Sequence, residues 1–137
     1  NSSISKATLS GIIANNSHVQ IENCTFSEIK QHAVEANTNC SVTVQSCKIS
    51  NSNIALISNK NAQIFAQNIS LRNCAYNFIA YGSRAYTPLS TVSVQRFESV
   101  AESNMSVIEQ GSLLILNTDT TKGTIKNYLK YYTDLNK

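Results

Sequence analysis

The sequence predicts an all-β solenoid, a parallel β-helix of about five coils, on three observations. A pattern of two apolar residues one position apart, followed after two further positions by a buried-type residue, recurs as Val19-x-Ile21-x-x-Cys24, Val42-x-Val44-x-x-Cys47, Ile69-x-Leu71-x-x-Cys74 and Val92-x-Val94-x-x-Phe97. Successive starts differ by 23, 27 and 23 residues (42−19, 69−42 and 92−69), and a degenerate fifth copy begins at Leu113-x-Ile115. The alternation has the period of two that is typical of a strand with one buried face. Because a repeat of this length cannot bury its apolar side alone, it is expected to stack on its neighbours.

The first element is expected to be a truncated coil. The opening residues resemble the second half of a repeat, because Ser2, Ile4, Ile12, Ala14 and Asn15 lie 22 positions before Cys24, Phe26, Val34, Ala36 and Asn37. We therefore expect this chain to be the C-terminal part of a longer protein, with an upstream domain as a partner.

Each following coil is expected to hold three short strands and three turns. Asn15, Asn37 and Asn59 recur every 22 residues (37−15 and 59−37), which predicts a stacked asparagine row at one corner, since Asn tolerates the left-handed conformation. Chance recurrence in an asparagine-rich chain is the alternative. The third coil is expected to be longer by about four residues between Asn59 and Asn68. Residues 82–88 contain the only proline, which predicts a loop leaving the coil.

The last segment has a different pattern. Five apolar residues after Gly123 follow helical spacing with Thr124 as a candidate N-cap: Ile125, Tyr128, Leu129, Tyr132 and Leu135. We expect a short helix over 124–135 that covers the open end of the last coil, so that coils occupy 1–123 and a cap segment 124–137. A helix that binds a partner or a membrane surface is the competing interpretation.

Composition excludes several classes of protein. The 137 residues suffice for one domain, and 42% hydrophobic content is that of a globular chain. The net charge is only +3, with no arginine-rich stripe, which argues against a nucleic-acid partner. No run approaches 18 apolar residues, so no membrane span is expected.

The repeats resemble those of right-handed parallel β-helix proteins of the pectate-lyase-like superfamily, which includes domains associated with carbohydrate-binding proteins and sugar hydrolases. Residues 17–27 and 42–51 carry the resemblance, which covers about residues 2–117. It implies a right-handed coil with three sheets, an inward asparagine ladder and, usually, polysaccharide binding along one outer sheet face. It implies no particular activity, since this scaffold supports many.

The cysteines predict neither a disulfide nor a zinc site. Cys24, Cys47 and Cys74 are expected to stack about 4.8 Å apart with parallel side chains, which does not suit disulfide geometry. No CxxC or His-x₃₋₅-His spacing occurs, so we expect no metal or cofactor and treat these thiols as small buried hydrophobes. Cys40, beside a corner, is the one expected to be exposed.

No catalytic residue is predicted. A lyase of this superfamily would need clustered acids to hold Ca²⁺, and a glycosidase two or three carboxylates facing one sugar. In the predicted register the outward positions are Gln20, Thr43, Ser70 and Ser93, then Glu22, Gln45, Arg72 and Gln95, so no acid row forms. His18 and His32 have no recognisable catalytic partners in the sequence.

The candidate glycan-binding residues are Tyr81, Arg84 and Tyr86, because an aromatic ring beside polar groups suits a sugar, and Tyr76 is expected in the core. Arg72 with Gln45 is a second candidate, against the alternative of a solvated charge. The predicted function is a non-catalytic scaffold, adhesion or glycan-binding module of an extracellular, cell-surface or virion protein. The alternatives are part of a polysaccharide lyase, hydrolase or epimerase with upstream catalytic residues, and a homotrimeric tail-spike or adhesin segment.

Overall fold

All regular structure in the described part of the chain is β-strand, and the strands stack in three rows. The computed structural model describes residues 2–82, 90–100 and 105–123. Row 1 contains β3 (His18–Glu22), β6 (Ser41–Gln45), the first halves of β9 (Gln63–Arg72) and β11 (Thr91–Val100), and β13 (Leu113–Leu116). Row 2 contains β1 (Ser2–Ser5), β4 (Cys24–Ser27), β7 (Lys48–Ser50) and the second halves of β9 and β11. Row 3 contains β2 (Ile12–Asn15), β5 (His32–Asn37), β8 (Ile54–Asn59), β10 (Tyr76–Tyr81) and β12 (Met105–Ile108).

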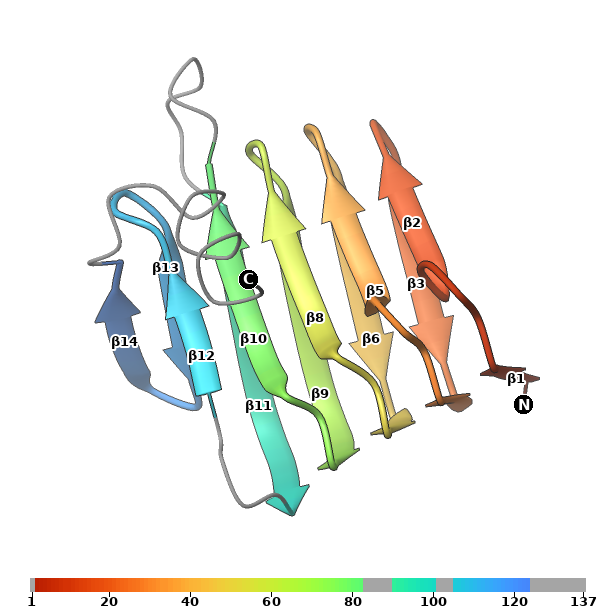
Figure 1. Cartoon of the computed structure of the whole chain (residues 1–137). Coiled ribbons are helices and arrows are strands. Elements are labelled where there is room, and N and C mark those ends of the chain that lie inside the picture. Colours follow the sequence, from red (N-terminus) through yellow and green to blue (C-terminus); the bar gives the residue numbers. More distant parts are fainter. Residues whose placement is uncertain (1, 83–89, 101–104, 124–137) are drawn as a thin grey trace, which may run out of the picture.

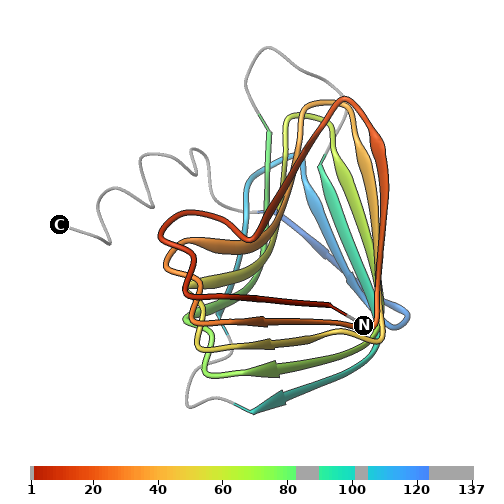
Figure 2. The same ribbon diagram turned by 90° about the vertical axis from the view of Figure 1, so that its right-hand side faces the viewer.

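The chain visits rows 1, 2 and 3 in turn, and every pairing within a row is parallel except the last in row 1. Viewed along the stack, the rows form the three sides of a triangle, and row 3 faces the viewer in Figure 1 (Figures 1 and 2). The predicted parallel solenoid of about five coils is therefore confirmed.

The predicted register holds for the first two coils and fails in the third. Val19 pairs with Val42, and Val42 pairs with Ile64 rather than with Ile69. Ile69 lies in row 2 of the same coil, two positions before Leu71, the partner of Ile49. The sequence prediction was wrong here because both rows of one coil carry the same apolar alternation.

The longer coil also lies elsewhere than predicted. Tyr81 pairs with Asn59, 22 positions earlier (81−59), whereas Thr91 pairs with Gln63, 28 positions earlier (91−63). The extra six residues (28−22) therefore fall between Tyr81 and Thr91, where the loop was predicted, and not between Asn59 and Asn68.

Left-handed residues turn the corners. Between rows 1 and 2 they form one column with φ from 52° to 55°: Asn23, Ser46, Asn68, Arg96 and Asn117. Asn15 pairs with Asn37 at the ends of row 3 strands, but the left-handed residues come after them, at Asn16, Thr38 and Asn39. Asparagine side chains are hydrogen-bonded at two corners: Asn61 donates to Asn39 at 2.8 Å after row 3, and Asn73 donates to Asn51 at 3.2 Å after row 2. The predicted row is in register at the end of row 3, since Asn15 pairs with Asn37 and Asn59 directly follows Ser58, the partner of Ala36. The left-handed conformations and the amide hydrogen bonds lie at other asparagines.

The interior is filled by one column of apolar side chains per inward strand position. Val42, Ile64 and Val92 in row 1 are 0% exposed, and they share one interior cluster with Phe78 of row 3 and Leu71 of row 2, each 1% exposed. Fully burying one such side chain stabilises the fold by about 1.5–3 kcal/mol. Stacked neighbours share this burial, so the coils depend on one another.

The C-terminal edge of row 1 is covered by a strand. β14 (Asp119–Lys122) runs antiparallel to β13 and is exposed throughout, which ends the parallel stacking. The predicted capping helix over 124–135 lies outside the described residues. In the described ranges no helix is long and apolar enough to cross a membrane.

The cysteine predictions need two corrections. Cys24 and Cys47 precede the paired residues Thr25 and Lys48, so they stack as expected, but Cys74 lies two positions beyond Arg72, the partner of Ser50, in a different column. Cys40, expected to be exposed, is 4% exposed and donates from Sγ to the carbonyl oxygen of Ala14. All four thiols are free, and burial raises the pKa of Cys47 and Cys74, which makes them poor nucleophiles.

Candidate functional site

The predicted site residues are not brought together. Gln45 is exposed at the end of a row 1 strand, Arg72 is exposed at the end of row 2, and Tyr81 is half-buried at the end of row 3. Arg84 and Tyr86 lie outside the described residues. Arg72 pairs with Ser50, and the column that contains Glu22 and Gln45 continues through Gln67 and Gln95 instead.

The hydroxyl of Tyr81 takes part in an internal hydrogen bond. It accepts from Asn59 Nδ2 at 3.1 Å, and Asn59 Nδ2 also donates to Glu35 Oε1 at 3.3 Å. Burial, with a smaller contribution from the charge of Glu35, raises the pKa of Tyr81 to about 12. Tyr81 is therefore a neutral phenol that orders the end of row 3.

The outward face of row 1 carries an arrangement that the misplaced register concealed. Phe65 pairs with Thr43 on one side and Ser93 on the other, and its side chain is 45% exposed. Beside these residues runs a column of three glutamines in register, Gln45, Gln67 and Gln95. Together they line a shallow depression of about 180 Å³, which we call the Phe65 face.

The chemistry of the Phe65 face is that of binding without catalysis. Its lining consists of an aromatic ring, amides and hydroxyls together with Ala66, whose methyl group points to the interior; the lining residues are Thr43, Gln45, Phe65, Ala66, Gln67, Ser93 and Gln95. None of these lining side chains carries a charge, so none can act as acid, base or carboxylate nucleophile.

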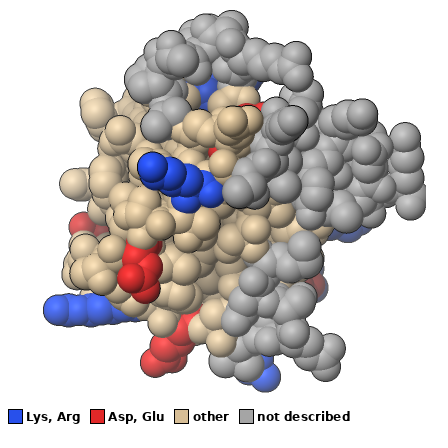
Figure 3. Space-filling view, turned by 90° about the vertical axis from the view of Figure 1, so that its left-hand side faces the viewer, with Lys and Arg blue, Asp and Glu red and all other residues tan. Residues whose placement is uncertain are grey.

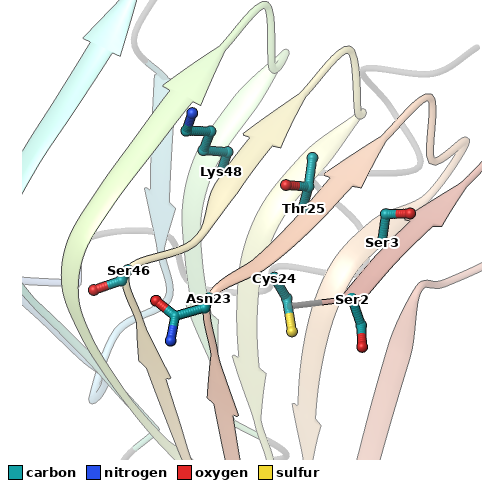
Figure 4. Close-up of a pocket in the computed structure, with 7 residues that line it drawn as sticks. All are labelled: Ser2, Ser3, Asn23, Cys24, Thr25, Ser46 and Lys48. Carbon is teal, nitrogen blue, oxygen red and sulfur yellow. The ribbon is translucent and has the colours of Figure 1, made fainter.

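Two larger hollows adjoin this face along the corner between rows 1 and 2. One, of about 460 Å³, is lined by hydroxyl, amide and thiol groups with Lys48 at its side (Figure 4). The other, of about 530 Å³, shares Ser46 and Lys48 with it and reaches Arg96 and Glu98. Because Ser46 and Arg96 directly follow Gln45 and Gln95, the corner continues the Phe65 face towards row 2.

A second polar cluster lies on the outward side of row 3. Ala33 and Val34 are both 0% exposed, so the alternation slips by one residue and His32 and Glu35 come to the same side. His32 Nδ1 lies 2.9 Å from Glu35 Oε2 and 3.3 Å from Ser10 Oγ. A catalytic relay requires the acid and the nucleophile on opposite ring nitrogens, whereas here both partners share Nδ1. The cluster is therefore not a serine-hydrolase triad.

Acid is expected to weaken this cluster. The hydrogen bond from His32 is the largest influence that lowers the pKa of Glu35 from its ordinary 4.5, against the raising effect of burial. Because the folded-state pKa is the lower one, the carboxylate contributes stability that is present above pH 4.5 and lost as the pH falls through the folded-state value. Urea unfolding of wild type and Glu35→Gln at a series of pH values should show a difference in free energy of unfolding that shrinks on acidification. A difference that stays constant between pH 6 and pH 3 would contradict this assignment.

Charge and metal-binding groups give no other site among the described residues. On the face that includes the C-terminal strands, basic and acidic side chains are interspersed rather than gathered in one patch (Figure 3). In the described ranges no three His, Cys, Asp or Glu side chains are grouped so that they could hold a metal ion. No protein-family model, no curated protein and no solved structure matches this chain.

Proposed function

We propose that this chain is a non-catalytic β-helical module that binds an uncharged glycan on the Phe65 face. The observation that carries the proposal is the exposed Phe65 ring that lies between two hydroxyl residues and beside a column of glutamines. A sugar ring presents an apolar face of C–H groups and a rim of hydroxyls. The C–H face packs well on an aromatic ring. The hydroxyl rim suits amides and hydroxyls, which both donate and accept hydrogen bonds.

The repeat of the solenoid favours an extended ligand. Successive coils place Gln45, Gln67 and Gln95 one strand spacing apart, about 4.8 Å. A linear glycan lying across the coils would meet an equivalent amide at each coil. The uncharged lining supports a neutral sugar over a uronic acid, since no cation lines the depression to pair with a carboxylate.

The wider setting is part of the proposal. We regard the chain as a right-handed β-helix of the pectate-lyase-like kind that serves as a rigid scaffold or adhesive element of a larger extracellular, cell-surface or virion protein. The resemblance of its repeats and the uncharged, stacked polar surface support this. A trimeric assembly and an enzyme with catalytic residues upstream are the alternatives.

Phe65→Ala is expected to weaken glycan binding about tenfold, which corresponds to about 1.4 kcal/mol. The wild type is first screened on an array of neutral and acidic glycans, and the best neutral ligand is then titrated calorimetrically with each variant. Ile13→Ala is the matched control, because Ile13 is 52% exposed on row 3, away from the Phe65 face, and its loss should leave the affinity unchanged.

Four results would count against the proposal. Binding to no glycan on the array, or equal affinity of Phe65→Ala and wild type, would remove the Phe65 face from consideration. Exclusive binding of acidic glycans would move the site to the corner beside Lys48 and Arg96. Cleavage of a bound glycan by this chain would contradict the non-catalytic assignment.

A further inference from the structure

The outward side of row 3 holds a second apolar cluster, separate from the interior. Ile54, Ile57, Tyr76, Ile79 and Val107 form it, with exposed fractions from 0% to 9%, and Tyr81 packs at its edge. The inward positions of the same strands are occupied by Ala55, Leu56, Phe78, Ala80 and Ile108, which belong to the interior cluster. Row 3 is therefore apolar on both faces in β8, β10 and β12, and we call its outer side the row 3 outer face.

Such a face requires a second layer. Contacts between neighbouring side chains on one sheet bury their flanks but leave their ends open, so a sheet face is removed from water only by an element packed over it. Ile57 is 1% and Ile79 0% exposed. Among the described strands, none lies over this face, which is turned towards the viewer in Figure 1 and to the left in Figure 2.

The described chain ends beside this face. Gly123 N donates to the carbonyl oxygen of Ser112 at 3.0 Å, and a methyl group on Gly123 would collide with the backbone of Glu109. Glu109 directly follows β12, the last strand of row 3. The described chain therefore ends with Gly123 at the C-terminal end of row 3, and 14 residues of the sequence follow Gly123 (137−123).

The sequence of these 14 residues fits the face in pattern and length. Ile125, Tyr128, Leu129, Tyr132 and Leu135 follow helical spacing on one stripe. A helix of 14 residues is about 21 Å long, whereas the three steps from β12 to β5 span about 14 Å. The stripe is thus long enough to cover the outer positions of β12, β10 and β8.

We propose that residues 124–137 bind across the row 3 outer face of the same chain, with the apolar stripe on Ile54, Ile57, Ile79 and Val107. This differs from the predicted lid on the end of the last coil, where β14 already covers the edge of row 1. The segment forms a second layer on one side of the triangle and leaves the Phe65 face open.

The test compares a change on the stripe with a matched change beside it. Leu129→Glu places a charge on the stripe, and Lys130→Glu places the same side chain on the opposite side. Hydrogen exchange measured by mass spectrometry in the full chain should be about tenfold faster in β8 and β10 for Leu129→Glu, with β6 and β9 unchanged. Lys130→Glu should exchange as the wild type does. If Leu129→Glu does not fold, Leu129→Ala should show a smaller increase in the same strands.

Two outcomes would overturn the proposal. One is exchange in β8 and β10 that is the same in all variants. The other is protection of these strands that rises with protein concentration while light scattering reports a dimer or trimer, because the row 3 outer face would then be covered by another copy of the chain.

Discussion

Replacing Phe78 by alanine is expected to lower the free energy of unfolding by about 3–5 kcal/mol, a large share of the 5–15 kcal/mol typical of a domain. Phe78 is 1% exposed and spans the interior from row 3 to row 2, where its ring meets Phe97 edge-on at 5.6 Å and 87°. Its strand neighbours are Leu56 and Ser106, so the cavity would open between three coils. Urea unfolding followed by circular dichroism measures the change.

Phe65→Ala is the matched control for this prediction. It removes the same side chain from a position that is 45% exposed, and its effect on the free energy of unfolding is expected to stay within about 0.5 kcal/mol. Together the two variants separate stability from binding, since Phe78 is expected to matter only for the first and Phe65 only for the second. A loss below 1 kcal/mol for Phe78→Ala would contradict the packing described for the third and fourth coils.

The sequence was sufficient to predict the solenoid because stacking imposes the same apolar position on every coil. Val19, Val42 and Val92 follow that position and pair through one row. It was insufficient for the third coil, because Ile69 and Leu71 of row 2 imitate the alternation of Ile64 and Ala66 in row 1. The predicted register was wrong by five positions (69−64). The sequence analysis therefore did not identify Phe65 as the centre of an outward face.

The row 3 outer face could have been predicted from the sequence by continuous apolar runs, which a search for alternating residues does not detect. Ile54 to Ile57 and Phe78 to Ala80 are continuous apolar runs, which are typical of strands buried on both sides. The cluster of Ser10, His32 and Glu35 left no such signal. It depends on the slip at Ala33 and Val34 and on contacts 22 residues apart, which only the three-dimensional register creates.

Deleting Thr43 is expected to cost at least about 1.5–3 kcal/mol, although Thr43 itself faces outward between Gln20 and Phe65. Val42 and Val44, both 0% exposed, would become adjacent, so one of them must leave the interior at a loss of about 1.5–3 kcal/mol. The left-handed corner position, now held by Ser46 with φ 52°, would shift onto Cys47, whose thiol is 1% exposed and would be drawn out of the interior.

Thr43→Ala keeps the length of the strand and removes the same hydroxyl, so it isolates the effect of register. Its free energy of unfolding is expected to lie within about 1 kcal/mol of the wild type, because the position is on the outer side of the sheet. Thermal and urea unfolding of both variants give the comparison. If the deletion is no more harmful than the substitution, then the coils do not depend on inward alternation at β6. In that case the stacking of Val42 on Val19 and Ile64 would not be what holds this part of the solenoid together.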